Sequence, residues 1–229
     1  MNALAIDCAV SRLVIAAKKD DKSCTGIFDI GMRQSEILVP QIDKILETAG
    51  LKPSELDYTV LTIGPGSFTG LRLGISAVKA IELAFGVPVY GISSLKTYEY
   101  PYKNLKLPVL TCIDANKDKF YASVTDFSDN GKVILEEGDW STDEIFEKVS
   151  ELEKLFIAGP DCEKLKSILI SKNLKAELIT LCPSIDTTQA LFELAENEKT
   201  AGNPALKDFD GPVYMRASEA EIKLKEATS

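Results

Sequence analysis

The chain has 229 residues, of which 45% are hydrophobic and 27% charged, the balance of an ordinary globular protein. Its formal net charge of -9 argues against strong direct binding of nucleic acid, because displacing counterions from phosphates requires a basic surface. The chain contains no histidine, which excludes a Ser-His-Asp triad, a Cys-His pair and any metal site that depends on histidine.

Segments that direct a protein out of the cytoplasm are not visible in the sequence. The N-terminus lacks the basic region and long apolar stretch of a secretory signal, and no apolar run approaches the roughly 20 residues that span a bilayer. The five cysteines are widely spaced, without a Cys-x-x-Cys pair, so we expect buried, reduced thiols. These features predict a cytoplasmic protein that makes no contact with a membrane.

The hydrophobic pattern predicts two halves with the same order of elements. Apolar alternation and short apolar runs predict the strands, and apolar spacing of three to four residues predicts the helices. Each half is expected to run strand, strand, strand, helix, strand, helix, strand, helix. In the first half these elements fall at 2–7, 12–18, 24–30, 35–49, 58–63, 71–85, 88–91 and from 93 onward. In the second half they fall at 107–114, 120–125, 132–137, 142–150, 154–158, 162–171, 176–181 and 187–197.

A three-strand meander followed by crossovers predicts a mixed sheet with helices on its faces. We therefore expect an α/β protein of two lobes, each built on such a sheet. The N-terminal lobe is predicted at 1–103 and the C-terminal lobe at 104–216, joined near a segment rich in Tyr, Lys and Pro. The charged residues 217–229 are expected to form a flexible tail.

A glycine-rich segment between a predicted strand and a predicted helix is the most informative feature of the sequence. It reads Gly64-Pro65-Gly66-Ser67-Phe68-Thr69-Gly70-Leu71-Arg72-Leu73-Gly74. Strand, glycine-rich turn and helix is a geometry that can aim backbone N–H groups at an anion. The alternative is a turn that only lets the helix start tightly against the sheet, with Ser67 and Thr69 as capping residues. It is not a Walker loop, because no Lys-Ser or Lys-Thr follows its last glycine.

As a whole, this segment resembles the signature of the bacterial TsaB (YeaZ) family. Three other stretches agree with the resemblance. Residues 3–7 look like the family's first strand, residues 33–40 resemble its Arg-His-Ser-x-x-Leu-x-Pro helix start, and residues 211–216 match its late Pro-x-Tyr-x-Arg. The histidine usual in the second of these motifs is Gln34 here, so that position cannot be required for acid–base chemistry.

The resemblance implies a duplicated fold of the actin-like ATPase (ASKHA) superfamily. It also implies a non-catalytic subunit in the synthesis of threonylcarbamoyladenosine beside the tRNA anticodon. The catalytic relative, TsaD, holds a metal through a His-x-x-x-His pair, which this chain lacks. The implied partners are a TsaD-like transferase and, as third subunit, a TsaE-like ATPase, with tRNA contacted only indirectly. A homodimer through the same surface is an alternative assembly. No intrinsic cofactor or metal is expected, although a nucleotide at a subunit interface is compatible with the resemblance.

Two predicted helices are the candidates for the partner interface. The helix at 71–85 is apolar nearly all round, so it must be covered on more than one side. The helix at 35–49 carries one broad apolar stripe and is its natural neighbour. With the resemblance, which implies pairing through these helices, the predicted contact residues are Leu38, Ile42, Ile45, Ala49, Gly70, Arg72, Gly74, Ala77 and Ile81. For Arg72 the alternatives are an ion pair with Glu36 or Glu82, a partner contact, or an anchor for the glycine turn.

The competing hypothesis is an enzyme, a small magnesium-dependent ATPase or kinase-like member of the superfamily. Its candidate nucleotide-binding residues are Asp7 and Asp114, because acidic residues at the ends of the equivalent strands sit over a metal-bound phosphate in that superfamily. The turns that follow them here carry side chains in place of glycines, and these would crowd a phosphate that seeks backbone N–H groups. The sequence therefore favours a protein without catalytic activity of its own.

Overall fold

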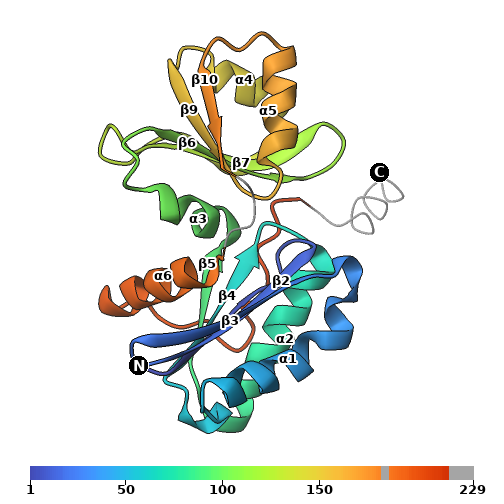
Figure 1. Ribbon diagram of the computed structural model, residues 1–229, viewed down its shortest axis with the longest axis vertical. Coiled ribbons are helices and arrows are strands. Elements are labelled where there is room, and N and C mark those ends of the chain that lie inside the picture. Colours follow the sequence, from blue (N-terminus) through green and yellow to red (C-terminus); the bar gives the residue numbers. More distant parts are fainter. Residues whose placement is uncertain (182–185, 217–229) are drawn as a thin grey trace.

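The computed structural model describes residues 1–181 and 186–216, and the predicted tail at 217–229 lies outside this range. Two lobes lie one above the other along the long axis of the molecule (Figure 1). The sheet of the first lobe has the strand order β3-β2-β1-β4-β5. Its strands are β1 (Ala3–Asp7), β2 (Arg12–Lys19), β3 (Lys22–Asp29), β4 (Tyr58–Gly64) and β5 (Val89–Ser93).

The second lobe repeats this design. Its sheet has the order β10-β9-β6-β7-β8, which is the order of the first sheet read from the other edge. In both sheets the first three strands pair antiparallel and the last two join in parallel. The predicted duplication is therefore confirmed. The strands are β6 (Pro108–Asp114), β7 (Lys119–Asp126), β8 (Lys132–Ser141), β9 (Lys154–Ala158) and β10 (Glu177–Thr180).

Two helices cover the outer face of each sheet. On the first sheet they are α1 (Gln34–Thr48) and α2 (Phe68–Phe85), and on the second α4 (Thr142–Val149) and α5 (Cys162–Ser171). Leu38 and Ile42 of α1 share one buried cluster with Leu4 and Ile6 of β1, which places a core between helices and sheet. Alternating side chains of a strand point to opposite faces, so the same strands have a second face to bury.

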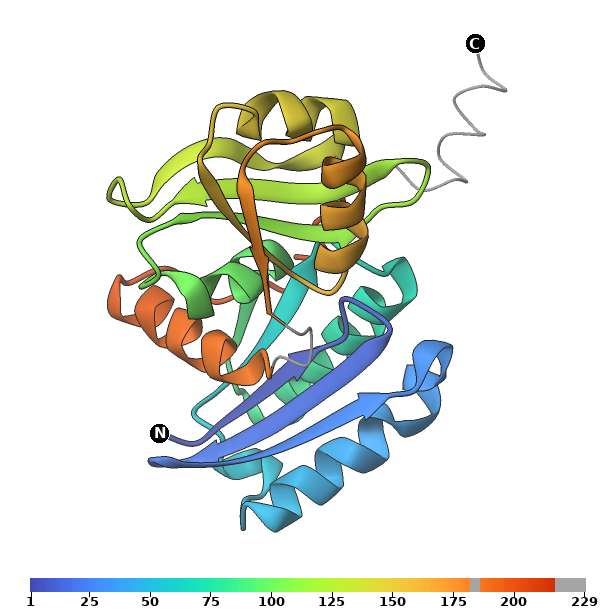
Figure 2. The same cartoon turned by 45° about the horizontal axis from the view of Figure 1, so that its top comes forward.

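The inner faces of the two sheets are covered by an exchange of helices. After β10 the chain returns to the first lobe, where Leu191 and Phe192 of α6 (Thr188–Thr200) pack against Tyr58 and Val60. In the other direction, α3 (Ser94–Glu99) lies between the sheets, and its Leu95 and Tyr98 pack with Ile113 of β6. Figure 2 shows α6 against the first sheet, below α3.

This exchange corrects the predicted division of the chain at 103/104. The second lobe was expected to extend to 216, yet α6 packs on the first lobe, and so does Leu206 after it. The physical reason is that α6 finds an inner sheet face of small residues, Ala3, Ala5 and Ala16, against which its own apolar stripe fits. Chain order alone carries no information about which sheet a helix covers.

The last described residues, 201–216, form a segment that we call the strap. It runs back along the first lobe beside α2 (Figure 1, red). Leu206 donates its backbone N–H to the carbonyl of Val89 at 2.8 Å, and Val213 donates to Ile63 at 2.7 Å. The ammonium of Lys79 on α2 donates to the carbonyls of Leu206 and Lys207, at 3.2 and 2.9 Å. The strap is thus hydrogen-bonded to β5, α2 and β4.

Among the described helices, none combines the length and the apolar character that crossing a bilayer would require. Four cysteines, Cys8, Cys24, Cys112 and Cys162, are free thiols, and Cys182 lies outside the described residues. Burial raises the pKa of Cys8 and Cys112, so these two thiols stay protonated.

Candidate functional site

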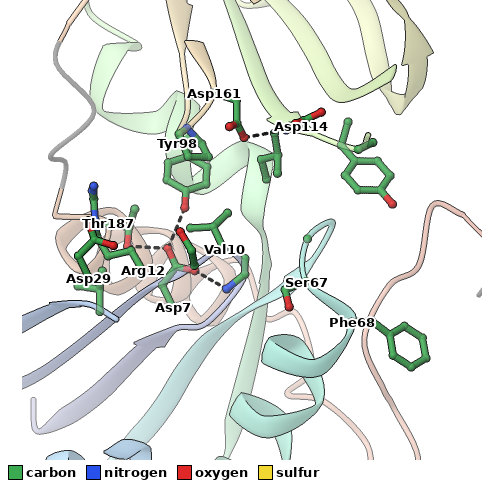
Figure 3. A pocket seen from close by; sticks show the side chains of 18 of the residues that line it. Asp7, Val10, Arg12, Asp29, Ser67, Phe68, Tyr98, Asp114, Asp161 and Thr187 are labelled. Carbon is green, nitrogen blue, oxygen red and sulfur yellow. Dashed lines mark hydrogen bonds between the residues drawn. The ribbon is translucent and has the colours of Figure 1, made fainter. Parts of the chain in front are cut away.

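A cavity of about 530 Å³ lies between the lobes (Figure 3). Its lower wall comes from the β1–β2 hairpin and the glycine-rich loop, and its upper wall from the β6–β7 hairpin and the turn before α5. The two aspartates predicted as nucleotide ligands, Asp7 and Asp114, both line it. The structure therefore brings the equivalent strand ends of the two lobes to one place, as the duplicated fold predicts.

The carboxylate of Asp7 is only 1% exposed and is fully occupied by hydrogen bonds. Its Oδ1 accepts from the backbone N–H of Ala9 at 3.0 Å and from the hydroxyl of Thr62 at 2.9 Å. Its Oδ2 accepts from the hydroxyls of Tyr98, at 3.3 Å, and Thr187, at 2.9 Å. These four donors come from four segments of the chain and replace the water that a buried charge would lose. The carboxylate therefore links four segments of the chain by hydrogen bonds. Its oxygens have little hydrogen-bonding capacity left for a metal-bound phosphate.

Asp114 is also held by residues of its own surroundings. Its Oδ1 accepts from the backbone N–H of Asn116 at 2.9 Å, and its Oδ2 from the ammonium of Lys164. Its own backbone N–H donates to Oδ2 of Asp161 at 2.7 Å. Burial raises the pKa of Asp161, and the charge of Asp114 nearby adds to this rise. Asp161 was not predicted as a site residue, because nothing in its local sequence distinguishes it from a surface aspartate.

The two hairpin turns share one hydrogen-bonding pattern. In each, the aspartate at the end of the strand accepts from the backbone N–H two residues later, Ala9 in the first lobe and Asn116 in the second. Such turns satisfy the N–H groups that a phosphate-binding hairpin would offer to its ligand. One backbone N–H of each turn is therefore engaged by the chain's own carboxylate.

The charge of the cavity has the same consequence. Asp7, Asp29, Asp114 and Asp161 line it, against the guanidinium of Arg12. Carboxylates that line a cleft make the electrostatic potential there more negative, and they repel a polyphosphate. Within residues 1–181 and 186–216, no group of three or more His, Cys, Asp or Glu side chains is arranged to hold a metal ion.

The glycine-rich loop is explained by close packing against the β1–β2 hairpin. A Cβ on Gly66 would lie 2.3 Å from the carbonyl oxygen of Ala9, and one on Gly70 would lie 2.1 Å from that of Cys8. The backbone N–H of Ser67 donates to the Ala9 carbonyl at 2.6 Å. The Ser67 hydroxyl accepts from Gly70 N–H at 3.2 Å and caps α2, as predicted. The glycines therefore serve a tight start of the helix, and two of the N–H groups that an anion would need are already engaged.

Gln34, at the position where the family usually has histidine, is a buried structural residue. Its Nε2 donates to the carbonyl of Val10 at 2.5 Å, and its Oε1 lies beside Gly70. It connects the start of α1 to the β1–β2 hairpin, which requires a hydrogen-bond donor but no titrating group.

Most of the predicted partner-contact residues lie inside the lobe. Leu38 has no exposed surface, and Ile42, Ile45, Gly70 and Gly74 are also buried. Ala49, Ala77 and Ile81 are partly buried and pack against the same core. These buried side chains pack in the core of the lobe, because an apolar stripe marks the face that a helix buries and does not say against what. Contact of the predicted residues with a partner stays a prediction.

The exposed apolar side chains of the two helices are different ones. Val39 of α1 is 58% exposed and Leu83 of α2 is 90% exposed, with Phe85 also largely in solvent. Ser76, Ala80 and Ala84 of α2 are exposed and small, so they leave room for another helix to approach. The signal that identifies this face is the helical position of Leu83, three residues after Ala80 and on the side opposite the buried Val78.

Arg72 is exposed but anchored. Its Nε donates to the hydroxyl of Tyr214 at 2.9 Å, and its guanidinium carbon lies 3.8 Å from the centre of the Phe68 ring. The ion pairs expected with Glu36 or Glu82 are not formed, since Glu36 pairs with Arg33 and Glu82 with Lys79. Of the three alternatives for Arg72, the structure supports the anchor near the glycine-rich loop.

Comparison with known proteins assigns the chain to a family. The family model of TsaD, tRNA N6-adenosine threonylcarbamoyltransferase, matches residues 31–199. The chain belongs to this family. The resemblance to the TsaB (YeaZ) family seen in the sequence is confirmed by curated relatives that are named TsaB.

The chain is 31% identical over 134 residues to "tRNA threonylcarbamoyladenosine biosynthesis protein TsaB" of Escherichia coli, an alignment that covers 57% of this chain and 58% of the relative. It is 26% identical over 125 residues to the Bacillus subtilis protein of the same name, covering 54% and 55%. It is also 29% identical over 135 residues to the tRNA N6-adenosine threonylcarbamoyltransferase of Moorella thermoacetica, covering 57% and 39%. The matched region thus spans less than two thirds of each of these relatives.

Solved structures confirm the fold over almost the whole chain. YeaZ from Pseudomonas aeruginosa superposes with a TM-score of 0.74 at 20% identity, covering 93% of this chain and 99% of that one. A second Pseudomonas aeruginosa structure, described as similar to the peptidase YEAZ, gives a TM-score of 0.76 at 22% identity, covering 94% and 99%. The two-lobed fold predicted from the sequence is therefore confirmed.

Proposed function

We propose that this protein is a non-catalytic subunit that binds a TsaD-like transferase and supports its transfer of threonylcarbamoyl to the adenosine beside the tRNA anticodon. The observation that carries the proposal is the exposed apolar side chains of the two helices, Val39 on α1 and Leu83 on α2, with the exposed small residues of α2 around Leu83. Small exposed residues around Leu83 leave room for a helix of another chain to pack closely on this face of α2.

The hydrogen bonds of the two aspartates in the cavity support a non-catalytic role. Asp7 has all its lone pairs directed at protein donors, and Asp114 is paired with Lys164. The chain also lacks the histidines with which the TsaD relatives hold their metal. The proposed mechanism is therefore binding: the helix face completes an interface and biases the partner toward its active arrangement. A TsaE-like ATPase as third subunit, and tRNA held by the partners, complete the proposed complex.

The test is co-purification of a TsaD-like transferase with the wild-type chain and with Leu83→Glu. Because Leu83 is exposed, the substitution should leave the monomer folded while placing a charge in the interface, and the transferase should be lost. Ile170→Glu is the matched control, since Ile170 is a 57% exposed residue on α5 of the other lobe. Full retention of the transferase by a folded Leu83→Glu variant would contradict the proposal.

The same preparation separates the two assemblies that this face could form. Sizing of the isolated chain by light scattering shows whether it is a homodimer, and Leu83→Glu should convert a dimer through this face to a monomer. A dimer that persists in the variant would place the self-contact elsewhere.

A further inference from the structure

We propose that the strap is a latch that holds the two lobes at a fixed separation across the cavity and links the start of α2 to the second lobe. The proposal concerns the chain alone and does not depend on the function proposed above. It accounts for the Pro-x-Tyr-x-Arg motif at 212–216, which neither the cavity nor the helix face explains.

One end of the latch is Tyr214. Its ring stacks on Phe68, the first residue of α2, with centroids 4.6 Å apart, and its hydroxyl accepts from Arg72. Just before it, the backbone N–H of Val213 donates to the carbonyl of Ile63 near the end of β4. The approach is close, because a Cβ on Gly64 would lie 2.4 Å from the carbonyl oxygen of Val213. This end is therefore fixed to the glycine-rich loop and to α2.

The other end is Arg216, which belongs to the second lobe by its contacts. Its Nε and Nη2 donate to the two carboxylate oxygens of Asp139 on β8, at 2.9 and 2.8 Å, and its Nη1 donates to the carbonyl of Ala115 at 2.8 Å. Forked pairing of a guanidinium with a carboxylate is among the stronger and more directional contacts in proteins. Both partners are partly buried, which limits screening by solvent.

The two anchors lie on opposite walls of the cavity. Phe68 lines it from the first lobe, and Ala115 lines it from the second. Tyr214 and Arg216 are two residues apart, and two residues of extended chain span at most about 7 Å. Because this connection is so short, it cannot lengthen much. The lobes therefore cannot separate on this side unless the contacts of Tyr214 or those of Arg216 break. A partner that displaces Phe68 or Arg72 on α2 would by the same connection displace the β6–β7 hairpin.

The experiment is hydrogen–deuterium exchange of the full chain, read by mass spectrometry, for wild type, Arg216→Gln and Tyr214→Ala. Loss of the Arg216 contacts should accelerate exchange at 114–119 and also at 64–70 in the other lobe, on the order of tenfold. Tyr214→Ala should accelerate exchange at 114–119, although its own contacts are in the first lobe. Lys154→Gln is the control, because it removes a second-lobe ion pair with Glu177 that lies outside the latch.

A purely local effect would overturn the proposal: exchange that changes only at 114–119 in Arg216→Gln and only at 64–70 in Tyr214→Ala. Arg216→Lys keeps the charge without the forked geometry and should accelerate exchange to an intermediate degree. This variant tests the proposal if Arg216→Gln does not fold. A second readout is Trp140, the single tryptophan, which follows Asp139 on β8. Its emission should shift in Tyr214→Ala, and an unchanged spectrum in that variant would count against the link between lobes.

Discussion

Thr187 and Asp7 are 180 residues apart in sequence, and the hydroxyl of the first donates to the carboxylate of the second at 2.9 Å. Thr187 immediately precedes α6, and Asp7 ends β1. The bond therefore fixes the point at which the chain returns from the second lobe to the first. It also makes Asp7, predicted as a candidate phosphate neighbour, one of the main polar contacts of the first lobe.

Asp7→Asn should destabilise the protein without removing a catalytic activity. The amide places an NH₂ group where the carboxylate accepted hydrogen bonds, so buried donors face one another. We expect the free energy of unfolding to fall by roughly 1–3 kcal/mol, measured by urea denaturation. Asp29→Asn is the control, because Asp29 lines the same cavity but is exposed. An Asp7→Asn variant that keeps its stability but loses magnesium-dependent ATP turnover would favour the enzyme hypothesis.

Gly70→Ala should destabilise the protein although Gly70 lies in a helix. Alanine is favoured over glycine in a helix interior by about 1 kcal/mol. The new Cβ would lie 2.1 Å from the carbonyl oxygen of Cys8, however, and overpacking of this kind costs roughly 1–3 kcal/mol. Thermal unfolding should show a lower Tm for Gly70→Ala and an unchanged one for Gly211→Ala, which has open space around it. Equal Tm values would show that the loop can shift to admit a side chain.

Leu38→Ala and Val39→Ala, neighbours on α1, should differ sharply. Leu38 is fully buried between α1 and the first sheet, so its truncation removes core contacts and leaves a cavity, at a cost of roughly 2–5 kcal/mol. Val39 is exposed, and its truncation should change the free energy of unfolding by no more than about 0.5 kcal/mol. Guanidinium denaturation of the isolated chain measures both. Similar costs for the two variants would place the helix in a different rotation.

Glu99→Gln should change how stability depends on pH. Burial raises the pKa of Glu99 in the folded protein, and the charge of Glu137 adds to this, while the Thr125 hydrogen bond and Lys96 oppose it. A raised carboxyl pKa means that the folded state binds the proton more tightly than the unfolded state. The contribution of this group to the free energy of unfolding is therefore at its maximum below the ordinary pKa of 4.5. It is lost as pH rises through the folded-state pKa.

Glutamine at position 99 can still accept the hydrogen bond that the Thr125 hydroxyl now donates at 2.8 Å. The variant should therefore gain stability relative to wild type as pH increases from about 4 to about 8, measured by urea denaturation across that range. A difference between the two proteins that does not vary with pH would refute the assignment to Glu99.

The helices and strands of this protein follow closely from its sequence, because nearly all of them bury a clear apolar stripe or run. The observed ends of these elements differ from the predicted ends by only a few residues. One example is α2, which begins at Phe68 because Ser67 caps it. The failures are of another kind. The placement of α6 on the first sheet and the burial of Leu38 depend on which surfaces meet, and neither is encoded in the local pattern of one element.

In the candidate site, too, some features could be predicted from the sequence and others could not. The equivalence of Asp7 and Asp114 could be predicted from the repeated openings of the two halves, and the structure brings both to one cavity. The groups that decide what these aspartates do could not be predicted. Tyr98, Thr187 and Lys164 reach them from distant parts of the sequence, and their spacing along the chain carries no periodic signal.

The exchange of α3 and α6 between the lobes bears on how such a molecule could have arisen. A half-length chain with this order of elements would leave the inner face of its sheet uncovered by its own last helix. Two copies would solve this by domain swapping, each lending that helix to the other, at the cost of folding only when they meet. Joining the copies in tandem makes the swap intramolecular and independent of concentration. A protein descended in this way cannot be cut back into two separately folding modules.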